Sequence, residues 1–253
     1  MADMLGTRPP DAASTKAITV PTVAGDQVDL TVDLAWPERA DSPLLALILP
    51  GIGTSLATYR PLVTALAVRG HAVAMPRLPF VDIETRLDVV ALLDALETRL
   101  SDQVRGRLGV VGHSLGNFHL VEALCAERST ELPAIALVAA STVATPAEDA
   151  GSLAHTTALL VVHSRRDLLC SYSAARRLYD SATGHRCIVT LEGSDHGAGV
   201  LTASPALARR LVPAITVDFF EGVRSGATDD LRRRALLVEA TRLGAVEAEL
   251  VCT

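Results

Sequence analysis

Residues 108–116 read Leu-Gly-Val-Val-Gly-His-Ser-Leu-Gly, an apolar run that ends in the pattern Gly-x-Ser-x-Gly. The pattern predicts a buried strand over Arg107–Gly112 and a helix over Ser114–Glu127, with Ser114 at the sharp turn between them. Glycines two positions before and two positions after the serine leave room for the neighbouring strand and helix. A serine at such a turn is exposed at the end of a sheet and lies near a helix N-terminus, which favours developing negative charge. Ser114 is therefore the candidate nucleophile.

A serine hydroxyl needs a base and an orienting acid before it can act as a nucleophile at neutral pH. In this topology they follow the serine in the order acid, then histidine. Asp167 follows one predicted strand and His196 follows the next, so both lie where open α/β sheets place their sites. The rival acid is Asp195, but its place next to His196 directs its side chain away from the imidazole face. We expect Asp167 to hold His196, and His196 to take the proton of Ser114.

The loop Pro50-Gly51-Ile52-Gly53-Thr54-Ser55 follows the predicted strand Leu44–Leu49. In acyl transfer, main-chain N–H groups must stabilise the developing oxyanion. We expect one from Leu115, the residue after the nucleophile, and one from Ile52, with Gly53 as the alternative. The loop lacks a long glycine run followed by Gly-Lys-Ser/Thr, so a nucleotide site is not expected.

The rest of the chain alternates apolar, strand-like runs with segments of helical spacing. This alternation predicts an α/β fold in which helices cover both faces of a parallel sheet. The strands predicted at Lys16–Thr22 and Gln27–Trp36 are expected to form a hairpin that turns at Gly25-Asp26. Further strands are predicted at Lys16–Thr22, Gln27–Trp36, His71–Met75, Ala134–Ala140, Thr157–His163 and Arg186–Leu191, and further helices at Thr58–Arg69, Glu84–Leu100, Ser171–Ser181, Pro205–Phe220 and Asp229–Leu243.

We expect one domain over residues 16–253 after a flexible tail, residues 1–15. From about residue 221 the chain goes beyond a minimal core as a helical extension. Its apolar residues could pack on the same domain or form a homodimer interface.

Composition excludes several classes of protein. Of the 253 residues, 49% are hydrophobic and 21% charged, which is enough apolar material for a large core. No continuous apolar run is long enough to cross a membrane. The net charge is −6 and only 3% of residues are aromatic, so neither a basic stripe nor base stacking supports nucleic-acid binding. The N-terminus lacks a signal-peptide pattern, which indicates a cytoplasmic protein.

The remaining cysteines and histidines suggest no cofactor. The four cysteines match neither zinc nor redox spacing, so no metal is expected. His113 is expected to pack beneath the turn, and His119 to be a buried or half-buried residue of the following helix. The other histidines have no partner pattern and are interpreted as structural: His71, His155, His163 and His185.

Between about Asp41 and Phe220 the chain resembles the α/β-hydrolase family. The resemblance lies in Leu-Pro-Gly-Ile-Gly, Tyr59-Arg60-Pro61-Leu62, Gly-His-Ser-Leu-Gly, Asp167 and Asp-His-Gly, which occur in family order. Within the family the chain is similar to dienelactone hydrolases and cutinase-like polyester hydrolases, and also to type II thioesterases over Pro50–Leu66. The resemblance implies a sheet of about eight mostly parallel strands. Only Ser141–Thr156 is available as a lid, so an open site is expected.

These patterns lead to one expected function and two alternatives. We expect a serine esterase that forms an acyl-enzyme on Ser114 and takes a small-molecule or carrier-bound acyl ester or thioester. The first alternative is a thioesterase, or an acyl-transferring or cyclising enzyme of a biosynthetic pathway, that uses the same residues. The second is a non-catalytic binding protein on this fold.

Overall fold

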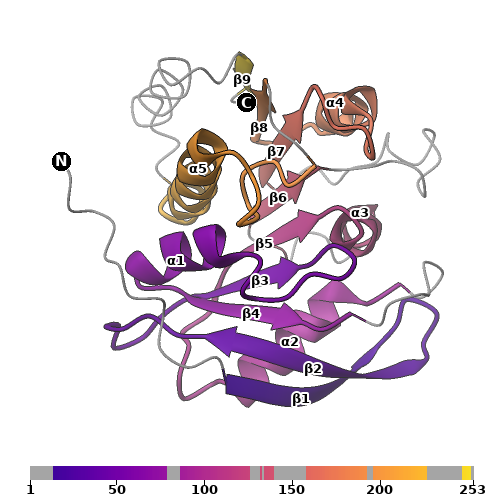
Figure 1. Ribbon diagram of the computed structural model, residues 1–253. Coiled ribbons are helices and arrows are strands. Elements are labelled where there is room, and N and C mark those ends of the chain that lie inside the picture. Colours follow the sequence, from indigo (N-terminus) through magenta and orange to yellow (C-terminus); the bar gives the residue numbers. More distant parts are fainter. Residues whose placement is uncertain are drawn as a thin grey trace.

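A single nine-stranded sheet runs through the part of the chain that the structure describes (Figure 1). The structure is a computed structural model, and it describes residues 14–78, 86–125, 132, 134–139, 158–192, 196–226 and 247–251. The strands are β1 (Ser14–Pro21), β2 (Gln27–Ala35), β3 (Leu45–Leu49), β4 (Ala72–Pro76), β5 (Arg107–His113), β6 (Ala134–Val138), β7 (Ala158–Ser164), β8 (Arg186–Leu191) and β9 (Glu247–Val251).

The strand order is β1-β2-β4-β3-β5-β6-β7-β8-β9. The six central strands, β4, β3, β5, β6, β7 and β8, are parallel to one another. Antiparallel strands flank them: β1 and β2 form the expected hairpin, β2 pairs with β4, and β9 pairs with β8. The mostly parallel sheet was predicted, whereas β9 was not.

Helices cover both faces of the sheet (Figure 1). Helices α1 (Arg60–Val68) and α5 (Ala206–Arg224) pack together on one face. Helices α2 (Val89–Arg99), α3 (Gly116–Cys125) and α4 (Tyr172–Ser181) lie on the other. Strand β3 shows why its sequence reads as a continuous apolar run: Leu45, Leu47 and Leu49 face one cluster of buried side chains, and Ala46 and Ile48 face the other.

Local sequence signals explain where the helices begin and end. Pro61 lies in the first turn of α1, and Gly70 follows its end with φ +80°. The Asp88 side chain caps α2 by accepting a hydrogen bond from the main-chain N–H of Ala91 at 2.9 Å. Helix α5 runs four residues past its predicted end at Phe220, to Arg224, and accommodates Pro213 in its interior.

Several expectations fall on residues outside the described ranges. These are the tail up to residue 13, the short lid at Ser141–Thr156 and the helix at Asp229–Leu243. Ser14 and Thr15, which were assigned to the tail, belong to β1. Among the described helices, none is both long and apolar enough to cross a bilayer.

The parallel strands bring the candidate residues to one edge of the sheet. Ile52 follows β3, Ser114 follows β5, Asp167 follows β7 and His196 follows β8. Because parallel strands point the same way, the loops after their carboxyl ends converge on one rim of the molecule.

Candidate active site

Ser114 lies at a tight turn between β5 and α3. Its φ is +52°, in the left-handed region that residues other than glycine rarely adopt. The flanking glycines permit this turn, because a Cβ on Gly116 would overlap the main-chain carbonyl of Leu49. A Cβ on Gly112 would lie 2.6 Å from Oδ1 of Asn117, on the first turn of α3. The predicted steric role of both glycines is therefore confirmed.

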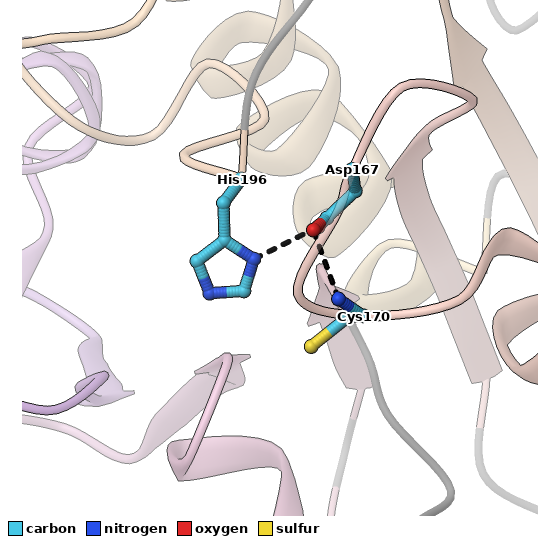
Figure 2. Close-up of side chains that lie close together, drawn as sticks. All are labelled: Asp167, Cys170 and His196. Atoms are coloured by element: carbon cyan, nitrogen blue, oxygen red, sulfur yellow. Dashed lines mark hydrogen bonds and ion pairs between the residues drawn. The ribbon is translucent and has the colours of Figure 1, made fainter.

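The structure brings Ser114, His196 and Asp167 into one hydrogen-bonded chain. The Oγ of Ser114 lies 2.8 Å from Nε2 of His196. On the other side of the ring, Nδ1 of His196 lies 2.8 Å from Oδ2 of Asp167. Figure 2 shows this contact as a dashed line. The Asp167 side chain is 0% exposed, whereas that of His196 is 22% exposed. The acid is thus shielded from water and the imidazole is open to a substrate.

The surroundings of Asp167 keep its carboxyl ionised. Its Oδ1 accepts hydrogen bonds from the main-chain N–H groups of Leu169 at 2.8 Å and Cys170 at 2.9 Å. Burial alone would raise the pKa of Asp167, but these two bonds and the bond from His196 outweigh it and hold the pKa below its usual value. A carboxylate can only accept, so Nδ1 of His196 carries the proton. Nε2 is then an acceptor for the hydroxyl of Ser114.

Cys170 and His163 also lie close to Asp167, on the segment that follows β7 and at the end of β7. The Sγ of Cys170, a carboxylate oxygen of Asp167 and a ring nitrogen of His196 lie within 4.8 Å of one another, a set that could hold a metal ion. A metal at this place would have to displace the hydrogen bonds that already join Asp167 to His196 and to the loop (Figure 2). The donor set therefore fits an oriented imidazole better than a metal centre.

Sequence reasoning did not connect His163 with the site. This buried residue of β7 donates from Nε2 to the carbonyl of Cys170 at 2.9 Å, and the same nitrogen lies 3.9 Å from Oδ2 of Asp167. Burial lowers the pKa of His163, so its ring is neutral. The i, i+4 spacing of His163 and Asp167 across a strand end was visible in the sequence, but no motif marks it.

A second hydrogen-bonded chain lies beneath the turn at Ser114. The main-chain N–H of Gly51 donates to the hydroxyl of Tyr59 at 2.8 Å, and this hydroxyl lies 2.8 Å from Nδ1 of His113. On the far side of the ring, Nε2 of His113 lies 3.1 Å from the carbonyl of His196. A carbonyl oxygen only accepts, so Nε2 carries the proton and Nδ1 accepts the Tyr59 hydroxyl proton.

This chain joins three parts of the site. Gly51 belongs to the loop after β3, His113 is the last residue of β5 and directly precedes Ser114, and His196 belongs to the loop after β8. Burial raises the pKa of Tyr59, which keeps its hydroxyl protonated for donation to His113. His113 is buried beneath the turn as expected, and its ring also joins Tyr59 to the main chain of His196 through hydrogen bonds. Tyr59 belongs to a motif that carries the family resemblance, but its pairing with His113, 54 residues away, could not be predicted from the sequence.

The two expected oxyanion donors line one pocket. It has a volume of about 370 Å³, and Gly51, Ile52, Gly53 and Leu115 contribute to its wall. Within the described residues, the main-chain N–H groups of Ile52 and Leu115 donate to no other group. Gly53, the alternative donor, has φ +68°, a conformation that glycine adopts without strain. The loop after β3 and the turn that carries Leu115 thus adjoin a space that is large enough for a small ligand.

The other expected residues separate into two groups. Asp195, the rival acid, and His155 lie outside the described residues. His71 and His119 are buried, and neither contacts the chain of Ser114, His196 and Asp167; His71 bonds Glu221 of α5 instead.

Comparison with known proteins supports the fold at low identity. No protein-family model and no curated protein matches the sequence. The chain is similar to the esterase domain of a Rhodothermus marinus protein, with 18% identity, a TM-score of 0.56, and 83% and 98% of the two chains covered. It is also similar to a cold-adapted esterase from an Arctic intertidal metagenomic library, with 16% identity, a TM-score of 0.59, and 82% and 92% covered.

A third similar structure is a protein of unknown function from Agrobacterium tumefaciens that is classed with the α/β hydrolases. It shares 14% identity and a TM-score of 0.59, and the match covers 83% of this chain and 97% of that one. The strand order, the turn at Ser114 and these likenesses agree. The chain has the α/β-hydrolase fold.

Proposed function

We propose that this protein is a serine hydrolase that cleaves carboxylic esters through an acyl-enzyme. The observation that carries the proposal is the chain of two 2.8 Å hydrogen bonds that runs from Ser114 through His196 to Asp167. The similarity to two esterases supports the same substrate class. No residue of this proposed mechanism requires a metal or an organic cofactor.

In the first half-reaction, Oγ of Ser114 attacks the ester carbonyl carbon while its proton passes to Nε2 of His196. The carbonyl oxygen becomes an oxyanion that accepts hydrogen bonds from the main-chain N–H groups of Ile52 and Leu115. His196 then gives its Nε2 proton to the leaving oxygen, the bond from carbon to that oxygen breaks, and an alcohol departs. Asp167 stabilises the imidazolium throughout without taking its proton.

In the second half-reaction, water replaces the alcohol. Nε2 of His196 takes a proton from water as the hydroxide oxygen attacks the acyl carbon. The tetrahedral intermediate collapses, the bond to Oγ breaks, and the same proton returns to Ser114. A carboxylic acid leaves and the enzyme is restored.

The test compares wild type with Ser114→Ala on a series of short to medium 4-nitrophenyl esters, together with labelling by a fluorophosphonate. Wild type is expected to turn over and to be labelled. Ser114→Ala is expected to lose labelling and to lower kcat by about 10⁴-fold or more. Ser173→Ala, which removes an exposed serine of α4, is the matched control and should behave as wild type.

Two other outcomes would redirect the proposal. If wild type is labelled but does not hydrolyse esters, either the substrate is an acyl-thioester or the acyl group passes to an acceptor other than water. If wild type is neither labelled nor active, the binding-protein alternative replaces the enzyme.

A further inference from the structure

The pocket that contains the expected oxyanion donors also has a charged wall. Arg77 and Asp33 line it, together with the apolar side chains of Leu78, Ile52 and Leu115. Arg77 directly follows β4, and Asp33 belongs to the neighbouring strand β2. Strand order places β4 beside β3, so Arg77 lies at the same rim of the sheet as the loop that carries Ile52.

Asp33 holds Arg77 in a fixed orientation. The N–H of Arg77 continues the antiparallel ladder by donating to the carbonyl of Thr31 at 2.8 Å. Asp33 pairs with Met75, so Asp33 and Arg77 are diagonal neighbours on one face of the β2–β4 pair. Nε of Arg77 lies 3.0 Å from Oδ2 of Asp33, and Nη2 lies 2.7 Å from Oδ1. This two-point contact fixes the plane of the guanidinium.

The pairing leaves one edge of the guanidinium available. Asp33 occupies the edge formed by Nε and Nη2, and among the described residues Nη1 donates to no group. The Asp33 side chain is only 9% exposed, whereas that of Arg77 is 61% exposed. The pair therefore presents its donor side outward, while its negative charge lies inside the protein.

We propose that Arg77 binds a carboxylate carried by the substrate, so that the preferred esters are those with a second, negatively charged carboxyl group. This inference rests on the proposed function. The free edge of the guanidinium offers parallel N–H groups, which match the two oxygens of a carboxylate. Because Asp33 already fixes the side chain, binding costs less conformational entropy than at a mobile arginine. The same pocket is also lined by the apolar residues Leu78, Ile52 and Leu115, which suit the hydrocarbon part of such an ester.

The experiment uses two pairs of isosteric esters, because the carboxylate could lie on the acyl part or on the alcohol part. Monomethyl glutarate is compared with methyl 5-methylhexanoate, in which an isopropyl group replaces the carboxylate. The anion of 4-acetoxybenzoic acid is compared with 4-isopropylphenyl acetate. Hydrolysis is followed by pH-stat, and the quantity of interest is the ratio of kcat/KM for the charged ester to that for the neutral one.

Wild type is expected to give a ratio above one in at least one pair. Arg77→Gln should lower that ratio by about ten- to a hundredfold, the usual loss when a hydrogen bond to a charged group is removed. The double variant Asp33→Asn/Arg77→Gln should lower it equally and avoids an unpaired buried carboxylate. Arg99→Gln, which removes the same charge from an exposed position at the end of α2, should keep the wild-type ratio.

Other results separate the two proposals. If neutral esters are hydrolysed but neither ratio exceeds one, or if Arg77→Gln leaves the ratio unchanged, the carboxylate subsite is wrong and the esterase stands. If no ester is hydrolysed and the fluorophosphonate fails to label Ser114, the proposed function fails and the subsite falls with it.

Discussion

At the scale of single residues, Asp167 decides which tautomer His196 adopts. Its Oδ1 is occupied by two main-chain N–H groups, so only Oδ2 is left for the imidazole. In Asp167→Asn, an amide nitrogen facing His196 would favour the tautomer that carries its proton on Nε2, which cannot accept the Ser114 proton. We expect kcat for a 4-nitrophenyl ester to fall by about 10⁴-fold with little change in KM.

Asp180→Asn is the control for this substitution, because Asp180 is an exposed residue of α4 that pairs with Arg176. It should keep wild-type kcat. A variant Asp167→Asn that retains most of its activity would make Asp195 the orienting acid instead.

Tyr59 is the residue through which the loop after β3 reaches His113. In Tyr59→Phe the main-chain N–H of Gly51 loses its acceptor and Nδ1 of His113 loses its donor, both in the protein interior. Such unsatisfied groups should lower the free energy of unfolding by about 1–3 kcal/mol. The displaced Gly51 loop, which carries Ile52, should also lower kcat at unchanged labelling stoichiometry.

Chemical denaturation and steady-state kinetics on the same preparations check this prediction. Tyr172→Phe is the matched control, since its hydroxyl bonds Thr190 and no group of the site. Equal losses of kcat in the two variants would mean that the Tyr59 network has no special role in the site.

At the scale of elements, His119 joins α3 to the segment that precedes α2. Its Nδ1 accepts a hydrogen bond from the main-chain N–H of Leu87 at 3.3 Å, which requires a neutral ring. Burial, together with the positive charge of Arg86, lowers the pKa of His119 from 6.5 to about 4. In the unfolded chain the ring titrates normally, so between these two pH values the unfolded state binds more protons.

The stability supplied by neutral His119 is therefore complete above pH 6.5 and is lost as the pH falls toward about 4. Urea denaturation at several pH values should show the free energy of unfolding falling by about 3 kcal/mol over this range from this group. His119→Asn keeps an acceptor for Leu87 without a titrating ring and should flatten this part of the profile. An unaltered slope in His119→Asn would contradict the prediction.

The elements that could be predicted from the sequence are those set by local signals. Strands β1 to β8 and helices α1 to α5 were anticipated because their apolar periodicity and their Gly and Pro residues act over a few neighbouring positions. The approach of Ser114, Asp167 and His196 was predictable because topology converts their chain order into a common rim.

What could not be predicted depends on pairing across the chain. Strand β9 is an edge strand that is defined by its antiparallel pairing with β8, in which Glu247 pairs with Thr190. The contact of Tyr59 with His113 and that of Asp33 with Arg77 join residues on different elements. Neither the spacing nor the type of these residues reveals such contacts, because each depends on how separate strands and loops are placed in three dimensions.

At the scale of the whole molecule, the continuous sheet couples the two layers of helices. Helix α5 lies against β5, β6 and β7 and also packs on α1. The fully buried ring of Phe220 lies over Gly109 of β5, where an added Cβ would come within 2.7 Å of the ring. Strand β5 continues directly into the turn at Ser114, so the packing of α5 supports the strand that positions Ser114.

Phe220→Ala tests whether this packing stabilises the molecule as one unit. The cavity left by the ring should lower the free energy of unfolding by about 3–5 kcal/mol. Because one sheet runs through both cores, circular dichroism and loss of fluorophosphonate labelling should follow the same shifted transition in denaturant. Leu168→Ala removes an apolar side chain that is 97% exposed, and should change stability by no more than about 0.5 kcal/mol. Labelling that is lost well before the circular dichroism signal in Phe220→Ala would instead mean that the rim carrying Ser114 unfolds independently of the sheet beneath it.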